Sequence, residues 1–424
     1  MGLVASVLRI LSSVGSLLTS IGIMTLGGSL LGILLPLNMH AAGLSTETAG
    51  LVMAAYFGGM LAGSVYGRRI IGRVGHIRAY AGFGAIVAAL ILGHGLWLNG
   101  AAWAALRFVH GFCGAGLSAT LESWLHERSD NRSRGRVLGI YLIIAYAAVI
   151  GGQLSVNLWH IESLQGYAVA ALLTCLALVP VLLTRIAAPD LSGIEPLGFY
   201  ALYKASPLAV VGCVASGMMM GTYFGLGALF ASDIGLNVLG VSLFTGSVMF
   251  GALALQWPIG RLSDRVERRR VLLGVLATVV AVCAVAAVAG HDGLGILGLM
   301  ALGALLGGTA SSVYPLATAQ AFDHLPRARY VAASGGLLLA YAIGAAIGPA
   351  SCGRVMAMFG PYAFFGFIGS VAAALALFVA YRMTRRAAVP VAEQEAVVVV
   401  PRNSPLAAEL DPRTPAASES HRTQ

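Results

Sequence analysis

The chain has 424 residues, of which 58% are hydrophobic and only 10% are charged, and its formal net charge is +9. An ordinary soluble domain carries about 25% charged residues, because its exterior faces water. Helices that face lipid must be apolar on the outside as well. The composition therefore excludes an ordinary soluble domain and indicates a polytopic α-helical membrane protein.

The apolar segments have the length that a bilayer requires, roughly 20 residues, once the chain is cut at charges, proline and glycine clusters and polar turns. We predict twelve spanning helices, near residues 14–38, 45–66, 79–98, 101–124, 137–159, 166–184, 207–231, 240–259, 271–290, 293–318, 330–352 and 361–381. Residues 1–184 are expected to form an N-terminal six-helix bundle and residues 207–382 a C-terminal one. A linker over 185–206 joins them, and the polar residues 383–424 are expected to be a disordered tail.

Arginine and lysine gather in alternate loops, which predicts the topology. The basic residues on one side include Arg68, Arg69, Arg73, Arg78, Arg128, Arg132, Arg134, Arg136, Arg185, Lys204, Arg261, Arg265, Arg268, Arg269, Arg270, Arg327 and Arg329. The other side receives essentially Arg354 alone. The positive-inside rule then places both termini, the linker and the tail in the cytoplasm, with the helices in the inner (plasma) membrane.

This distribution also identifies the partners of the positive charge. Arginines next to spanning helices contact anionic lipid headgroups, so we expect a lipid bilayer and no nucleic acid as the partner. We expect the chain to act as a monomer.

Motifs for enzymatic or metal chemistry are missing from the sequence. The sole lysine, Lys204, is followed by Ala205 and Ser206, so the chain lacks a G-x-x-x-x-G-K-[ST] phosphate loop and is not an ATP-driven pump. The five cysteines lie singly within apolar segments without C-x-x-C spacing. We therefore expect no catalytic residue, no metal site and no cofactor.

An internal repeat relates the two halves of the chain. The turn "GRRIIGRVGHIRAY" after the second predicted span resembles "GRLSDRVERRRVLL" after the eighth, and matching Arg73 with Arg265 gives an offset of 192 residues (265 − 73). The same offset carries the first span onto the seventh. The pattern favours two homologous six-helix halves, as in many transporters.

Several motifs resemble the major facilitator superfamily of secondary transporters. "GRLSDRVERRR" resembles its G-x-L-x-D-R-x-x-R-R signature, "LRFVHGFCGAG" its fourth-helix R-x-x-x-G element, and "GAAIGP" its G-x-x-x-G-P element. The stretches "AYFGGMLAG", "LESWL" and "VYPLATA" resemble more narrowly the YcaD-like branch of bacterial transporters. The resemblance implies an all-α fold of two six-helix bundles that works by alternating access.

The signature turn departs from the family pattern in its placement. The Asp-Arg pair is usually strongest after the second span, but Gly72 stands there in this chain and the better copy contains Asp264. In related transporters such a turn latches the two halves, which implies a latch made by Gly260, Asp264, Arg265 and Arg268. The alternative is that the arginines only anchor the turn to lipid headgroups.

Few ionisable residues lie inside the predicted spans, and each costs about 2.5 to 3.5 kcal/mol at the bilayer centre. Arg107 is the candidate for substrate binding, with snorkelling to the outer surface as the alternative. Glu122 and His110 are the candidates for proton coupling. A static ion pair is the alternative for Glu122, and a packing role is the alternative for His110.

Polar and glycine spacings complete the list of candidate residues. Gln153 and Asn157 lie one turn apart in the fifth span, which favours a cavity lining that binds substrate. Glycines at four-residue intervals let helices approach closely, and we expect two such stripes to form the moving contact between the bundles. These glycines are Gly59, Gly63, Gly67, Gly344 and Gly348.

The sequence thus indicates a secondary active transporter for a small molecule, with protons as the candidate coupling ion. A lone Arg107 without an acidic partner in the membrane favours anionic or zwitterionic cargo. A passive facilitator is the alternative, and a membrane enzyme or sensor without transport is the alternative from another class.

Overall fold

The computed structural model describes residues 2–97, 99–129, 134–184, 198–289, 295–402, 404, 410, 411 and 413. Within them lie twelve long helices: α1 (Gly2–Ala41), α2 (Thr46–Val74), α3 (His76–Leu96), α4 (Gly100–Glu127), α5 (Arg134–Ser155), α6 (Leu164–Leu182), α8 (Pro207–Asp233), α9 (Val238–Ser263), α10 (Arg268–Ala289), α11 (Ile296–Phe322), α12 (Tyr330–Phe359) and α13 (Ala363–Arg385). Short elements are α7 (Phe199–Ala205) and the 3₁₀ turns η1 (Val156–Leu158), η2 (Arg327–Arg329) and η3 (Val391–Glu393).

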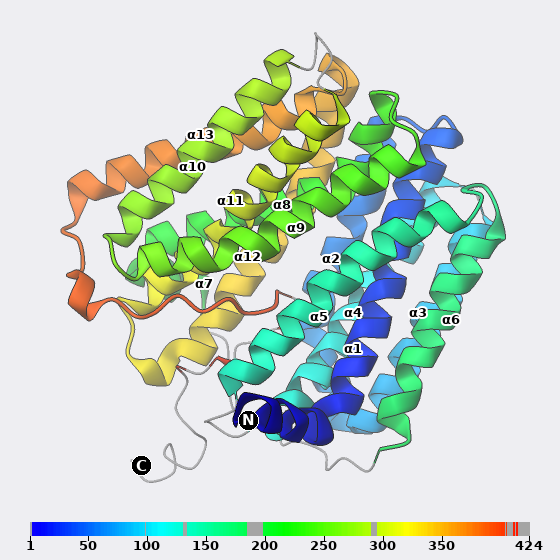
Figure 1. Cartoon of the computed structure of the whole chain (residues 1–424), viewed down its shortest axis with the longest axis horizontal. Coiled ribbons are helices and arrows are strands. Elements are labelled where there is room, and N and C mark those ends of the chain that lie inside the picture. The colour runs from blue at the N-terminus through cyan, green and yellow to red at the C-terminus, as the bar shows by residue number, and fades with distance from the viewer. Residues whose placement is uncertain are drawn as a thin grey trace.

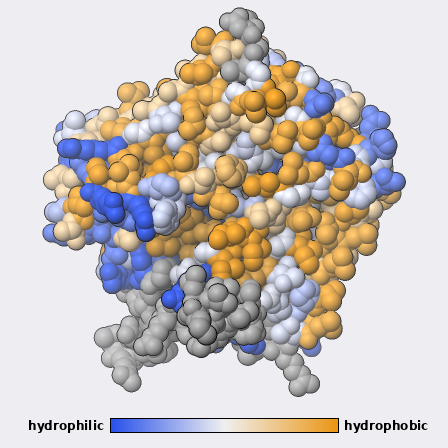
Figure 2. All heavy atoms as spheres, viewed as in Figure 1, coloured by the Kyte–Doolittle hydropathy of each residue, from blue (hydrophilic) through white to orange (hydrophobic). Residues whose placement is uncertain are grey.

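The all-helical fold class is confirmed, and a long helix lies at each of the twelve predicted spans. Eleven helices in the described part of the chain are long and apolar enough to cross a membrane. α4 falls outside that set, and it is the helix that carries Arg107, His110 and Glu122. Hydrophobic residues cover most of the face shown in Figure 2, as lipid contact requires.

Local signals fix where several helices begin and end. The Asn99 side chain accepts hydrogen bonds from the amides of Ala101 and Ala102 and so caps the start of α4 (2.9 and 3.2 Å). Asn237 caps α9 in the same way through the Gly240 amide (2.8 Å). α2 ends at Gly75, whose φ of +86° suits glycine.

The helices pair in the same order in each half of the chain (Figure 1). In the first half α2 packs on α4, α1 on α5, and α3 on α6. In the second half α9 packs on α11, α8 on α12, and α10 on α13. Across the halves α2 contacts α12, α5 contacts α9, and α1 contacts α8. This arrangement is what a repeated six-helix unit produces.

The two ends of the helix bundle differ. We call the end where α2 meets α3 and α9 meets α10 the arginine-rich end, because it holds Arg73 and Arg265, and we call the other the opposite end. In Figure 1 the ribbons of the halves converge toward the top, which is the opposite end. They diverge toward the bottom, where α1 begins.

Backbone contacts close the opposite end. A Cβ atom added to Gly50 of α2 would lie 2.5 Å from the Pro349 carbonyl oxygen of α12, and one on Gly353 would lie 2.6 Å from the Thr46 carbonyl oxygen. A hydrogen bond joins the two halves at the same end, with 2.8 Å between His40 Nδ1 and an Asp233 carboxylate oxygen. The halves are therefore in contact where glycine leaves room for close approach.

The predicted glycine stripes lie elsewhere. On α2, Gly59 and Gly63 face the backbone of Phe108 and Phe112 on α4, and Gly67 faces Gly116. On α12, Gly344 and Gly348 face Val214 and Met218 on α8. The prediction that these glycines form the contact between halves is wrong, because they pack helices within a half. Helical spacing shows that glycines share a face, but not which helix lies against it.

The tail, which was expected to be disordered, contacts the helices where the structure describes it. α13 continues to Arg385, and the chain then runs along the arginine-rich end with side-chain and backbone contacts up to residue 404. Figure 1 shows this segment running along the second half toward the space between the halves. Within the predicted linker, α7 is helical and residues 185–197 lie outside the described residues. In the predicted tail, residues 403, 405–409, 412 and 414–424 lie outside them.

Candidate functional site

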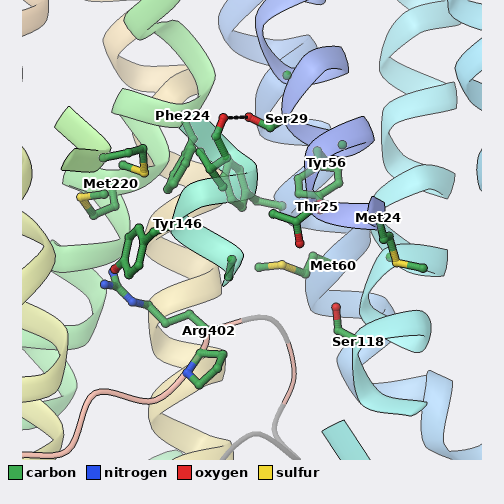
Figure 3. Close-up of a pocket in the computed structure, with 18 of the residues that line it drawn as sticks. Met24, Thr25, Ser29, Tyr56, Met60, Ser118, Tyr146, Met220, Phe224 and Arg402 are labelled. Carbon is green, nitrogen blue, oxygen red and sulfur yellow. Dashed lines mark hydrogen bonds between the residues drawn. The ribbon is translucent and has the colours of Figure 1, made fainter. Parts of the chain in front are cut away.

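A cavity of about 400 Å³ lies between the two halves. Helices of both halves line it, together with the tail residues 399–402. Its polar lining includes Arg107, His110, Gln153, Tyr146, Ser311 and Tyr341, and no Asp or Glu is among the described lining residues. Figure 3 shows labelled side chains from both halves pointing toward the same space.

Arg107 faces this cavity from α4. Its side chain is only 6% exposed, and its guanidinium carbon lies 4.3 Å from the centroid of the Tyr56 ring on α2. Arg107 Nε has no hydrogen-bond partner among the described residues. The guanidinium therefore lies inside the protein against an aromatic face, so snorkelling to the outer surface does not describe it.

His110 lies one turn further along α4, beside the same tyrosine. Its ring centroid is 5.6 Å from that of Tyr56, in an edge-on arrangement, and the side chain is buried. His110 Nδ1 has no hydrogen-bond partner among the described residues. Arg107, His110 and Tyr56 thus form one cluster on the wall of the first half.

Gln153 and Asn157 separate in the structure. Gln153 is buried, lines the cavity, and its Oε1 has no hydrogen-bond partner among the described residues. α5 ends at Ser155, so Asn157 falls in η1, where it is exposed and donates a hydrogen bond from Nδ2 to Ser242 Oγ (2.9 Å). The prediction that Asn157 lines the cavity is wrong, because helical spacing does not continue beyond the helix.

Glu122 lies near the end of α4, behind the cavity wall. It is 1% exposed and accepts a hydrogen bond from the hydroxyl of Tyr141, which does line the cavity (3.2 Å). Ser404 of the tail donates a second hydrogen bond to the other carboxylate oxygen. Glu122 thus connects the cavity wall to the tail, and its role in proton coupling stays a prediction.

The signature turn binds the tail. Asp264 caps the end of α9 and accepts a hydrogen bond from the Val397 amide (2.8 Å). A Cβ atom on Gly260 would lie 3.5 Å from Val397, so the tail passes directly over this glycine. The latch prediction pairs Asp264 with the other half, whereas the partner found here is the tail. Arg265 is exposed.

A buried ion pair supports the same surface. Arg268 and Asp323 are both 1% exposed, with 2.7 Å between a guanidinium nitrogen and a carboxylate oxygen. The other oxygen of Asp323 accepts from the Glu395 amide (2.9 Å), and Arg268 donates to the Glu395 carbonyl. Burial raises the pKa of the Asp323 carboxyl, and the Arg268 guanidinium opposes this by stabilising the charged form. Of the four residues predicted to form the latch, Arg265 is exposed, whereas Gly260, Asp264 and Arg268 contact the tail.

Arg402 is one of the site residues that sequence reasoning missed, together with Tyr56, Tyr146 and Tyr341. Its guanidinium donates a hydrogen bond to the Ser311 carbonyl (3.0 Å) and lies 5.4 Å from the ring centroids of both Tyr314 and Tyr341. The one signal in the sequence is the apolar run "VVVVPR", which is unusual for a disordered tail. Among the described residues no cluster of three or more His, Cys, Asp or Glu could hold a metal ion.

Comparison with known proteins identifies the family. The sequence profile of the Major Facilitator Superfamily matches residues 17–226 and 208–416. The uncharacterized MFS-type transporter YcaD of Escherichia coli O139:H28 is 29% identical over 357 residues, which covers 84% of this chain and 92% of that relative.

Solved transporters share the fold. The nucleoside transporter NupG superposes with a TM-score of 0.73 at 15% identity, over 88% of this chain and 99% of that one. The E. coli fucose:proton symporter FucP gives 0.53 at 17% identity, over 88% and 99%. The profile match carries the assignment, and these structures agree with it in fold. The chain therefore belongs to the major facilitator superfamily and is a multi-pass membrane transporter, not an enzyme.

Proposed function

We propose that this transporter moves a small molecule with an anionic group across the plasma membrane by alternating access, coupled to protons. The observation that carries the proposal is Arg107, a buried cation that faces the cavity with an unpartnered Nε. A buried charge is costly unless it is paired. A carboxylate or phosphate would supply the partner, because it matches the planar guanidinium with two parallel hydrogen bonds.

The shape of the molecule supports an inward-facing state. The halves are in backbone contact at the opposite end, near Gly50 and Gly353. The positive-inside rule assigns the arginine-rich end, and with it both termini, to the cytoplasm. Cargo would then enter or leave the cavity on the cytoplasmic side once the tail is displaced.

Proton coupling is proposed through Glu122, with His110 as the second candidate. Glu122 is buried, and Tyr141 connects it to the cavity wall. A buried carboxyl exchanges protons in response to changes in its neighbours, which is what coupling needs. FucP, whose fold this chain shares, is a proton symporter.

A ligand screen tests the anion site. Wild type, Arg107→Lys and Arg107→Ala would be measured by thermal stabilisation against anionic and zwitterionic metabolites, with Arg261→Ala as control. Arg261 is an exposed arginine stacked 3.7 Å over the Trp257 ring and is not part of the cavity lining. We expect Arg107→Ala to weaken binding by roughly 10-fold or more and Arg107→Lys by less. Equal binding by wild type and Arg107→Ala would refute the anion site.

Transport assays with the ligand found by that screen test the coupling. In proteoliposomes a pH gradient should drive its accumulation, and Glu122→Gln should transport without accumulating. Uptake that ignores the gradient in wild type would identify a passive facilitator. Binding without any uptake would favour a sensor.

Labelling of single cysteines tests the orientation. A cysteine at Arg270 should react only from the cytoplasmic side, and one at Leu158 only from outside. Both positions are exposed, at 72% for each side chain. The reverse pattern would overturn the topology.

A further inference from the structure

Three tyrosines, drawn from both halves of the chain, lie around the Arg402 guanidinium beside the cavity. Tyr314 and Tyr341 lie edge to face, with 5.3 Å between their centroids, and the guanidinium carbon is 5.4 Å from each. Arg402 also donates to the Ser311 carbonyl (3.0 Å). Figure 3 shows its side chain extending toward Tyr146. We call Tyr146, Tyr314, Tyr341 and the Ser311 carbonyl the tyrosine cage.

Gln256 holds two members of the cage in place by hydrogen bonds. Gln256 donates from Nε2 to the Ser311 carbonyl (3.0 Å) and accepts from the Tyr146 hydroxyl (3.0 Å). Among the described residues no carboxylate forms an ion pair with Arg402. The cage thus attracts a cation through ring faces and a carbonyl dipole, without a counter-charge that would fix it permanently.

Arg402 reaches the cage from a tether. Val397 is fixed to Asp264, and Glu395 to Asp323, at the arginine-rich end. Arg402 lies five positions after Val397, which is enough to span about 17 Å of extended chain. A ligand on such a tether is present at a high effective concentration, so it competes with any free ligand for the same place.

We propose that the tyrosine cage is a subsite for a guanidinium-type cation on the cargo, and that Arg402 occupies it as a tethered competitor. This rests on the proposed function, since it assigns the second end of the same cargo. The acidic group would bind Arg107 on the first half and the cationic group would bind the cage, which specifies a zwitterion. Transport then requires the tail to leave the cavity.

The experiment uses full-length protein in nanodiscs and radiolabelled methylguanidinium as the probe, with the neutral isostere N-methylurea as the control ligand. The variants are Arg402→Ala, Arg402→Ala with Tyr341→Ala, and Arg402→Ala with Tyr341→Phe. Arg261→Ala is the control, because Arg261 is an exposed arginine outside the tail and is not part of the cavity lining. Arg107→Ala is included to separate the two subsites.

We expect Arg402→Ala to bind methylguanidinium several-fold more tightly than wild type, and Arg261→Ala to bind it as wild type does. Adding Tyr341→Ala should abolish the gain, whereas Tyr341→Phe should keep it, because the ring face provides the attraction. Arg107→Ala should leave binding of this probe unchanged, whether or not Arg107 binds an anionic group.

A second measurement follows the tail without altering the cage. In a Cys175→Ser background, maleimide labelling of a Val400→Cys variant should accelerate several-fold with methylguanidinium and stay unchanged with N-methylurea. Equal probe binding by wild type and Arg402→Ala would overturn the proposal. So would binding that survives Tyr341→Ala, or an equal response to N-methylurea.

Discussion

The two ends of the helix bundle hold the halves together by different means. At the opposite end α2 and α12 touch through glycines and backbone, with Gly50 against Pro349. At the arginine-rich end the tail bridges the halves, from Asp264 and Asp323 on one side to Glu122 on the other. The first contact is mainly backbone against backbone, with the exposed His40–Asp233 hydrogen bond beside it, whereas the second depends on buried charged groups. One contact is thus made by the helices themselves, and the other by the segment that follows α13.

Loss of the buried ion pair should have the largest effect. Arg268→Ala leaves the Asp323 carboxylate buried without its partner, so we expect the free energy of unfolding to fall by about 3–5 kcal/mol. Reversible unfolding in mixed micelles measures this. Arg270→Ala is the control, because Arg270 is 72% exposed in its pair with Glu267 and should change stability by about 1 kcal/mol at most. Equal effects of the two substitutions would contradict the structural role given to Arg268.

Overpacking of the glycine contact should open the opposite end. A methyl group at Gly50 meets the Pro349 carbonyl, so Gly50→Ala should disfavour the closed contact by about 1–3 kcal/mol and shift the population roughly 10-fold. Pulsed EPR distances between labels at Leu158 and Leu239 report the change. Gly274→Ala has open space around its Cβ and should leave the distances as in wild type. If both variants give the wild-type distance, the glycine contact does not set this gate.

Removal of the tail's acceptor should release the tail. Asp264→Ala loses the hydrogen bond from the Val397 amide, which is worth about 1.5 kcal/mol for a charged acceptor that is partly exposed. Maleimide labelling of a Val400→Cys background should rise about 10-fold. Asp264→Asn keeps an acceptor oxygen and should label nearly as slowly as the parent. A latch to the other half would instead make the two substitutions equally disruptive to turnover, with tail labelling unchanged.

The smallest effect is expected at Asn157. Asn157 itself is exposed and its hydrogen bond to Ser242 is only partly buried, so Asn157→Ala should weaken the opposite end by only about 0.5 kcal/mol, seen as a slight broadening of the same EPR distances. Asn157→Ala should leave ligand binding unaffected, because Asn157 does not line the cavity. Gln153→Ala should weaken binding, because Gln153 does line it. If Asn157→Ala weakened ligand binding as much as Gln153→Ala does, Asn157 would be part of the ligand site.

The sequence was a good guide to the helices and to one wall of the site. Apolar runs and basic turns predicted all twelve long helices, because both are local properties of the chain. Arg107 was identified as a candidate since an ionisable residue inside an apolar segment requires a reason to be there. Its position facing the cavity beside Tyr56 agrees with that reasoning.

Tertiary structure alone decided which surfaces meet. The glycine stripe of α2 was visible in the sequence, but the helix it faces, α4, was not. The contact between halves falls instead on Gly50 and Gly353, which no regular spacing marks. Arg402 reaches a cage whose tyrosines lie more than 60 residues away in sequence. Spacing along one helix determines which residues share a face, whereas packing between distant helices determines what that face touches, and the cavity and its tail ligand belong to the second kind of information.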